Sequence, residues 1–224
     1  LFDSTVTPTN VVIVLDGQVG QELLDVLDDF DNLLPLRICN ININKGFVKA
    51  LNYAVYNAQS DYLFRLDPDD IVEASRFEKT LSVFQSYIPD VVVSNGFVID
   101  SNSEIIYEHK TNLDLIYKRN TILHSSVAYK RSFIVKHAGY RQVVSFEDYD
   151  LWLRALKYGD TIHVINEPLV RFRQDKNFIN RRLGGAYMAK EYQAFKLFLS
   201  ESLIPYKAVP FWWLRLISRL LGSG

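Results

Sequence analysis

The sequence has little of what marks a secreted or membrane-spanning protein. Its single cysteine, Cys39, has no partner for a disulfide within the chain and lies in an apolar run, where core packing is its expected role. No stretch reaches the roughly 18 apolar residues that a spanning helix needs, and no basic segment followed by an apolar one opens the chain. These absences favour a reducing compartment, and we expect a cytoplasmic protein.

The chain also lacks an excess of charge of either sign. Its 224 residues include 25 lysines and arginines against 26 aspartates and glutamates, a formal net charge of -1. Without a basic field to attract a phosphate backbone, nucleic acid is not an expected partner, and an anionic ligand has to be held by local groups. Methionine occurs once, at Met188, so we expect that Leu1 is not a native start and that further chain lies upstream.

Short β-branched runs alternate with segments of helical period from Asn10 onward. Strands are expected at 11–15, 36–41, 62–66, 91–99, 104–107, 125–130, 161–165 and 169–173. Helices are expected at 21–30, 46–58, 75–87, 146–158 and 182–199, with a last one from residue 210. This alternation is typical of an α/β fold with a largely parallel sheet, and ligands of such sheets bind at the carboxyl ends of the strands.

The segment YLFRLDPDD brings three carboxylates, Asp67, Asp69 and Asp70, from the end of an apolar strand into one tight turn. Clustered carboxylates repel one another unless a cation lies among them, and Mg²⁺ is commonly held by one or two carboxylates together with substrate phosphates. A turn of this composition can also serve only to cap the following helix. The segment alone leaves a metal or nucleotide site and a structural turn both open.

A second group of acids, Glu147, Asp148 and Asp150, opens the helix expected at 146–158, in the segment SFEDYDLW. Acids in a first turn also stabilise the helix dipole without any further role. One acidic site is suited to a metal-diphosphate and the other to a general base. Their pairing on this kind of sheet favours a catalytic function.

Five segments occur in the order found in glycosyltransferase family 2: ININKGFVKALNYAV, YLFRLDPDDI, ILHSSVAYKRS, FEDYDLWLRALKYG and EPLVRFRQDKN. The chain resembles that family over nearly its whole length, and most closely its bacterial enzymes of surface-polysaccharide assembly. The resemblance implies a GT-A fold, which is a Rossmann-like three-layer α/β/α sandwich with a mixed, mainly parallel sheet. It also implies a catalytic domain over residues 1–205, whose first strand lies upstream of Leu1, and an amphipathic helix in 206–224.

The resemblance further implies an inverting, metal-dependent transfer from a nucleotide-diphosphate sugar, with UDP as the expected carrier. The positions that match donor-contacting residues of the family are Asp16, Lys45, Gly46, Asn52, Arg65 and Asp67. Asp67 and Asp69 match its DxD pair, which implies a divalent metal cofactor, Mn²⁺ or Mg²⁺. Taken from the residues alone, Asp16 also fits a simple turn, Gly46 a helix start and Asn52 a polar group on a helix face.

By the same resemblance, Asp148 is the catalytic base that takes a proton from the acceptor hydroxyl. Glu147 and His124 fall near the expected acceptor side, and Asp70 is expected to support the acidic turn. A lone histidine such as His124 is more often a hydrogen-bonded core group than a catalyst. Many relatives have a histidine after a Tyr-Arg pair in the last core strand, where this chain has Phe172, Arg173, Gln174 and Asp175; either Asp175 replaces it as an oxygen ligand or the contact is absent.

Beyond Pro210, helical projection places Trp213, Leu214, Leu216, Ile217, Leu220 and Leu221 on one broad face, with Arg215, Ser218 and Arg219 opposite. A helix over 210–221 with this pattern can lie in a membrane interface, pack on the catalytic core or form a dimer contact. A peripheral position at the cytoplasmic membrane face would suit the glycan or lipid-linked oligosaccharide acceptors that the resemblance implies. The alternative to transfer is a non-catalytic module that binds a nucleotide sugar.

Overall fold

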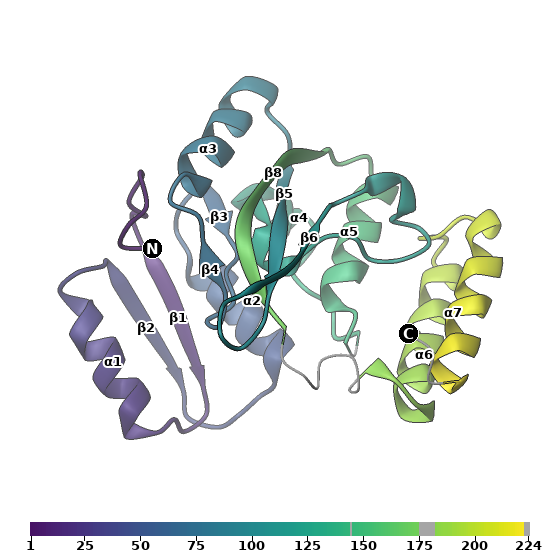
Figure 1. Cartoon of the computed structure of the whole chain (residues 1–224), viewed down its shortest axis with the longest axis horizontal. Helices are drawn as coiled ribbons and strands as arrows, with labels where there is room; N and C mark the ends of the chain where they lie inside the picture. Colours follow the sequence, from purple (N-terminus) through teal and green to yellow (C-terminus); the bar gives the residue numbers. More distant parts are fainter. Residues whose placement is uncertain (144, 175–181, 222–224) are drawn as a thin grey trace.

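The computed structural model describes residues 1–143, 145–174 and 182–221 and shows an α/β fold with two sheets (Figure 1). In the smaller sheet, β1 (Val11–Asp16) pairs in parallel with β2 (Leu36–Ile41). The larger sheet has the order β3-β7-β5-β8-β4, with β6 paired to the far end of β5. Its strands are β3 (Tyr62–Phe64), β4 (Ile71–Val72), β5 (Val91–Ile99), β6 (Ile105–His109), β7 (Ala128–Lys130) and β8 (Ile162–Arg173).

Parallel pairing dominates where the strands are long. β5 and β8 run parallel along the whole of β5, and β1 and β2 do so over their full lengths. The shorter pairings of β3, β4, β6 and β7 are antiparallel. The sequence predicted two separate strands at 161–165 and 169–173, which is wrong. β8 is one continuous strand. Its pairing with β5 shifts register between Ser94 and Gly96, so the residues just before Pro168 have no partner on β5 and the pairing resumes after them.

Seven α-helices accompany the sheets in the part of the chain that the structure describes. They are α1 (Gln21–Asp31), α2 (Phe47–Asn57), α3 (Arg76–Tyr87), α4 (Arg131–Lys136), α5 (Glu147–Lys157), α6 (Gly185–Ser200) and α7 (Val209–Leu221). The sequence did not predict α4, because six residues directly after a strand are too few for a helical period to stand out.

Helices cover both faces of the larger sheet, and the central strand β5 therefore carries apolar side chains on both sides. Val91 and Val93 point into the main core, which also contains residues of α2, α4 and α5. Val92 joins a smaller cluster on the opposite face, together with Phe84 of α3. This arrangement confirms the predicted three-layer sandwich with a mixed sheet.

The two C-terminal helices, α6 and α7, pack together at one end of the molecule (Figure 1). Trp212 of α7 is fully buried and stacks on Tyr149 of α5 at a centroid distance of 5.9 Å. The helical pair therefore shares the main core, and the division of the chain at residue 205 stays a prediction. Within the described residues, no helix is both long enough and apolar enough to cross a bilayer.

The orientation of α7 departs in part from the projection, which placed Leu216 beside Trp213. Leu216 is 3% exposed and packs inside, whereas Trp213 is 48% exposed. Arg215 and Arg219 do lie opposite Trp213, but they point into the protein because both pair with the buried carboxylate of Glu191 on α6. The side chains of Leu220 and Leu221, also predicted for the apolar face, lie outside the described residues.

Candidate active site

The carboxyl ends of β1 and β2 meet at the first group of predicted site residues. Asp16, the last residue of β1, accepts hydrogen bonds from the backbone N–H groups of Lys45 at 2.7 Å and Gly46 at 2.8 Å. Gly46 has a φ of 91°, a conformation that residues with a Cβ rarely adopt, and α2 begins directly after it. Asp16 therefore fixes the turn into α2, and both of its carboxylate oxygens are engaged there.

A pocket of about 280 Å³ lies between this turn and the loop before α5. It is lined by Lys45, Gly46, Phe47, Val48, Lys49, Gln142, Ser145 and Glu147. Lys45 of the turn and Lys49 of α2 contribute positive charge and Glu147 at the start of α5 contributes a carboxyl group, so the cavity carries groups of both charge signs. It brings the predicted donor-side residues Lys45 and Gly46 together with the predicted acceptor-side residue Glu147.

The acidic turn after β3 is held by a serine from a distant segment. Ser125 Oγ lies 2.9 Å from Asp67 Oδ2 and also contacts Asp70 Oδ2. Arg65 pairs with the other oxygen of Asp67 and donates to the carbonyl of Leu66. Two of the three carboxylates therefore share one hydroxyl, and a guanidinium lies beside one of them.

Asp70 is the last acid of this turn and is partly buried, and this burial raises its pKa to about 6. The Ser125 hydroxyl has one proton, which it donates to one carboxylate at a time. Protonated Asp70 can therefore donate to Ser125 Oγ while Ser125 donates to Asp67. The other oxygen of Asp70 accepts the backbone N–H of Arg173 at 2.8 Å, which braces the turn against β8.

Asp69 is exposed, and no hydrogen bond among the described residues reaches its carboxylate. Its backbone carbonyl accepts Arg173 Nε at 3.0 Å, and Arg173 continues to the carbonyls of Asp100 and Ser101 beyond β5. The described residues contain no group of three or more His, Cys, Asp or Glu side chains that could hold a metal ion. Asp67 and Asp69 still offer hard oxygen ligands, which suit a divalent ion that completes its coordination with substrate phosphates and water.

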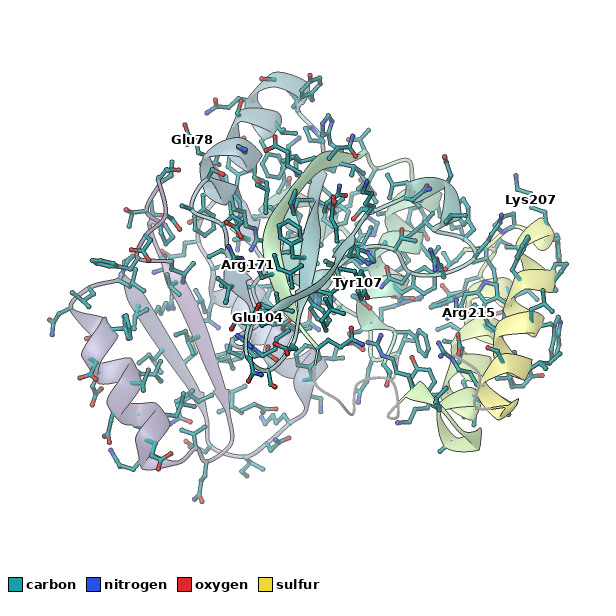
Figure 2. The ribbon with its side chains drawn as sticks, viewed as in Figure 1. Glu78, Glu104, Tyr107, Arg171, Lys207 and Arg215 are labelled. Carbon is teal, nitrogen blue, oxygen red and sulfur yellow. The ribbon has the colours of Figure 1, made fainter. Side chains whose placement is uncertain are left out.

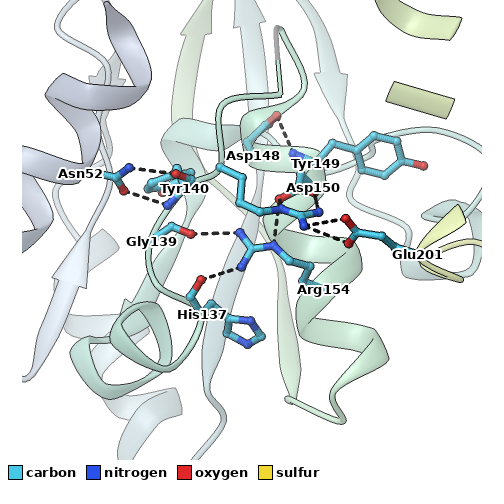
Figure 3. A network of polar contacts seen from close by, with 10 residues as sticks. Asn52, His137, Gly139, Tyr140, Asp148, Tyr149, Asp150, Arg154 and Glu201 are labelled. Carbon is cyan, nitrogen blue, oxygen red and sulfur yellow. Dashed lines mark hydrogen bonds and ion pairs between the residues drawn. The ribbon is translucent and has the colours of Figure 1, made fainter. Parts of the chain in front are cut away.

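Asn52 on α2 is bonded to the protein itself. Its Nδ2 donates to Tyr140 O at 2.8 Å, and its Oδ1 accepts Tyr140 N at 2.8 Å (Figure 3). The neighbouring Gly139 has a φ of 77°, and a Cβ there would collide with the Asn52 amide. Asn52 therefore ties α2 to the loop before α5 and holds Tyr140 in place.

Asp148 lies in the first turn of α5 and is held from two sides. Its Oδ1 accepts the backbone N–H of Tyr149 at 2.7 Å, and its Oδ2 accepts Asn120 Nδ2 at 2.9 Å. Next to it, burial raises the pKa of Glu147 to about 7, and the charge of Asp148 adds to the rise. The start of α5 therefore carries one carboxylate fixed by two hydrogen bonds and one carboxyl group that titrates near neutrality.

Charges of the acidic turn act on the groups at the start of α5. Burial is the main cause of the raised pKa of Glu147; Arg65 opposes that rise and Asp67 adds to it. His124 has the same charged neighbours, but burial lowers its pKa to about 4, so its ring is neutral at pH 7. Its Nε2 lies 3.1 Å from the Tyr140 hydroxyl. The structure thus brings the acidic turn, His124 and the start of α5 together near Arg65.

A buried ionic network connects α5 to the segment after α4 and to the end of α6. Asp150 is 0% exposed and pairs with both Arg141 and Arg154. Arg154 also donates to two backbone carbonyls just beyond α4, and Arg141 donates to the carboxylate of Glu201 at the end of α6 (Figure 3). Asp150, which the sequence grouped with Glu147 and Asp148, therefore belongs to the support of the helix.

Sequence reasoning did not single out Ser125 or Asn120, although each bonds to a predicted site carboxylate. Ser125 belongs to the segment ILHSSVAYKRS, so the family resemblance contained a signal for it. Asn120 stands just before that segment, and nothing in the sequence marks it. Asp175, predicted as an alternative metal ligand, lies outside the described residues.

An α/β/α sandwich with an acidic turn after one strand and an acid at the start of a later helix has the architecture of a GT-A glycosyltransferase. Residues 1–150 match the family described as Glycosyl transferase family 2, and the chain belongs to that family. It is 31% identical over 217 residues to the UDP-Gal:alpha-D-GlcNAc-diphosphoundecaprenol beta-1,3-galactosyltransferase of Escherichia coli, an alignment covering 92% of this chain and 78% of that protein. It is 30% identical over 207 residues to the amylovoran biosynthesis glycosyltransferase AmsE of Erwinia amylovora, covering 89% and 77%. The predicted family is confirmed.

Two solved structures share the fold at low sequence identity. The S. aureus TarS fragment in complex with UDP-GlcNAc superposes with a TM-score of 0.66 at 16% identity, over 85% of this chain and 58% of that one. The mannosyltransferase PcManGT of Pyrobaculum calidifontis, in complex with GDP-Man and Mn²⁺, gives a TM-score of 0.64 at 13% identity, over 97% and 68%. These neighbours confirm the predicted GT-A fold.

Proposed function

We propose that this protein transfers a sugar from a UDP-sugar to a hydroxyl of a glycan or lipid-linked acceptor, with inversion at the anomeric carbon. The observation that carries the proposal is the meeting of two acidic groups near Arg65, namely the turn with Asp67 and the helix start with Glu147 and Asp148. The chain's relatives are glycosyltransferases, which favours transfer over a non-catalytic module that only binds nucleotide sugar.

The donor would bind over the carboxyl ends of β1, β2 and β3. Lys45 and Gly46 line the pocket of about 280 Å³, and Asp16 keeps their turn in its shape. Arg65 supplies a positive charge beside Asp67 that can meet a diphosphate. We assign Asn52 to positioning, because both ends of its amide are already bonded to Tyr140.

Asp67 and Asp69 would hold a divalent metal ion, Mn²⁺ or Mg²⁺. Their carboxylate oxygens are ligands of the right chemistry, and the Asp69 carboxylate is exposed to receive one. A fold neighbour was solved with Mn²⁺ and GDP-Man, which supports the assignment. When bound, such an ion supplies positive charge that stabilises the departing diphosphate.

Asp148 would act as the general base. It accepts the proton of the acceptor hydroxyl as that oxygen forms its bond to the anomeric carbon. The bond from this carbon to the diphosphate oxygen breaks at the same time, and its electron pair leaves with UDP. Asn120 holds one carboxylate oxygen at 2.9 Å, so the orientation of Asp148 is set before the acceptor arrives. The neutral ring of His124 offers hydrogen bonding without charge.

The acceptor class is suggested by the relatives. One of them is named for a diphosphoundecaprenol-linked GlcNAc acceptor and another for amylovoran biosynthesis. We therefore expect a hexosyl transfer in bacterial surface-polysaccharide or lipopolysaccharide assembly. The protein would work in the cytoplasm, in peripheral contact with the membrane through residues 210–221.

The proposal is tested by calorimetric titration of UDP into the protein, first with Mn²⁺ present and then with the metal chelated. We expect binding that requires the metal. Asp69→Ala should lose that requirement together with at least about tenfold in affinity, because one carboxylate ligand of the ion is gone. Asp28→Ala, which removes an exposed acid on α1, is the matched control and should bind as the parent does.

Equal UDP affinity with and without metal would remove the metal from the donor site. Equal affinity in Asp69→Ala and the parent would remove Asp69 from it. Absence of UDP binding in both conditions would overturn UDP as the carrier, and the same titration with GDP would then test another nucleotide.

A further inference from the structure

The outer face of α7 is apolar and uncharged. Phe211, Trp213, Leu214 and Ile217 are 42%, 48%, 64% and 50% exposed. With 3.6 residues per turn, Trp213, Leu214 and Ile217 fall on the half of the helix opposite Arg215 and Arg219, and Phe211, one turn before Arg215, lies at the edge of this face. Exposed apolar residues scattered singly are ordinary, but three on one helix face with a fourth at its edge form a continuous apolar surface.

The polar side chains of α7 are used inside the protein. Arg215 and Arg219 both pair with Glu191, which is 0% exposed, and Arg215 also lies over the ring of Trp212 at 4.8 Å. Figure 2 shows Arg215 on the side of α7 that faces the rest of the molecule. If the outer face of α7 met only water, we would expect the arginines to point outward and Trp213 and Leu214 to point inward.

Basic side chains outnumber acidic ones in the C-terminal segment that carries this apolar surface. Residues 182–221 include six lysines and arginines but only two acids. Both acids are already paired, Glu191 with the arginines of α7 and Glu201 with Arg141. Lys190, Lys196 and Lys207 are exposed, and no carboxylate of the described residues forms an ion pair with them. Within the described residues, these three lysines therefore add positive charge at this end of the molecule that no ion pair neutralises.

Aromatic rings and lysines adjoin one another at the edges of the surface. The Tyr192 ring lies 6.0 Å from that of Trp213, and Lys196 Nζ lies 5.3 Å from the centre of the Tyr192 ring. At the other edge, Lys118 Nζ lies 4.2 Å from the ring of Phe211. Tryptophan and tyrosine favour the boundary between headgroups and hydrocarbon, and lysine can lay its stem along apolar groups while its ammonium reaches the headgroups.

We propose that this face docks on a lipid bilayer with anionic headgroups, with α7 lying in the plane of the interface and Trp213, Leu214 and Ile217 buried in it. Lys118 and Lys196 at the edges of the face complement anionic lipid. A second copy of the chain fits less well, because a two-fold contact through this face would bring the same lysines together. The inference deepens the peripheral location proposed above, and it rests on the surface of α7 rather than on the donor site.

The first test needs no variant. The chain has three tryptophans, of which Trp152 and Trp212 are 0% exposed and Trp213 is 48% exposed. On addition of phosphatidylcholine vesicles containing phosphatidylglycerol, we expect a blue shift of the fluorescence and loss of acrylamide quenching, both due to Trp213. Pure phosphatidylcholine vesicles should bind at least about tenfold more weakly, and added salt should narrow the difference. Trp213→Phe should bind these vesicles without the shift.

A flotation assay with matched variants locates the contact. Leu214→Gln with Ile217→Gln should weaken binding to the anionic vesicles by about tenfold or more, because two apolar side chains no longer enter the interface. The control is Ile105→Gln with Ile106→Gln on β6, which changes two isoleucines that are 53% and 55% exposed and should float as the parent does. The urea midpoint of each variant verifies that it is folded.

Three results would overturn the inference: anionic vesicles that bind no better than neutral ones, an unchanged Trp213 signal, or equal flotation of both double variants. A concentration-dependent dimer in sedimentation equilibrium, dissociated by Leu214→Gln with Ile217→Gln, would assign the face to a second copy instead. Metal-dependent UDP binding by the same variant keeps the two proposals apart, since loss of vesicle binding leaves the donor site intact.

Discussion

Replacement of Asp148 by asparagine removes the proposed base with little change in shape. The carboxylate accepts two hydrogen bonds, from Tyr149 N at 2.7 Å and from Asn120 Nδ2 at 2.9 Å. An amide has one acceptor oxygen, so the variant keeps one of these contacts and loses the other. A lost hydrogen bond to a half-buried charged group costs about 1.5 kcal/mol, which a domain with a typical stability of about 5 to 15 kcal/mol tolerates. We therefore expect Asp148→Asn to fold.

The effect on transfer should be far larger than the effect on stability. General base catalysis contributes about 10² to 10⁴ in rate, so kcat should fall by at least about a hundredfold. UDP affinity should stay within about twofold, because no residue assigned to the donor is changed. Initial rates of UDP release, at saturating donor and acceptor, measure the first quantity, and calorimetric titration measures the second.

Asn120→Ala is the matched variant, since it leaves the carboxylate of Asp148 in place and removes one of its two supports. We expect an intermediate loss of about tenfold in kcat, because the base is present but less well oriented. Near-normal turnover by folded Asp148→Asn would refute the assignment of the base. A loss of UDP affinity as large as the loss of kcat would refute it too, because Asp148 would then act in donor binding.

Three further predictions concern the supports of the site. Asn52→Leu leaves the buried backbone N–H and C=O of Tyr140 without partners, so the free energy of unfolding in urea should fall by about 2 to 4 kcal/mol with UDP affinity unchanged. A tenfold loss of UDP affinity at full stability would instead indicate that Asn52 contacts the nucleotide. In the folded protein the pKa of Glu147 is about 7, against 4.5 for the free group, so between these values the folded state binds more protons than the unfolded state. The free energy of unfolding should therefore fall as pH rises across that interval. Glu147→Gln should lose this part of the pH dependence, and an unchanged dependence in urea titrations at several pH values would contradict the assignment. Glu191→Leu should lower the unfolding free energy by about 2 kcal/mol or more, because Arg215 and Arg219 lose their buried partner. An unaltered urea midpoint would contradict this, since it would mean that both guanidinium groups are solvated by water in the variant.

Much of the fold could be predicted from the sequence because its signals are local. A strand that ends in Asp16 or in the turn with Asp67 shows itself as a β-branched or apolar run followed by polar residues. The start of α5 shows itself in the same way, by acids before a helical period. The order of these segments also carried the family resemblance, so the sandwich, the family and the candidate carboxylates were all accessible before the structure.

The partners of those carboxylates were not accessible, because they come from remote parts of the chain. Ser125 reaches Asp67 across 58 positions, and Asn120 reaches Asp148 across 28. Asn52 bonds to the backbone of a residue 88 positions away, which no helical pattern can indicate. Pairing across such distances depends on how strands and helices pack, and composition and period do not encode it.

The inward arginines of α7 escaped prediction for a related reason. Helical projection correctly separates Arg215 and Arg219 from Trp213, but it cannot tell which side faces the protein. That choice depends on a single buried carboxylate, Glu191, on another helix. Where one buried charge outweighs the usual rule of apolar inside and polar outside, only the three-dimensional structure reveals it.

The stacking of Trp212 on Tyr149 has a consequence for the order of events during protein synthesis. Tyr149 follows the proposed base directly, and its ring stacks on Trp212 at 5.9 Å. During translation, the donor-side strands leave the ribosome before Trp212 and Leu216 do, because they precede these residues in the sequence. We expect a nascent chain to form its nucleotide pocket early and to complete the packing of α5 only when α7 emerges. Catalytic competence would then be acquired only after α7 has emerged, later than the nucleotide pocket.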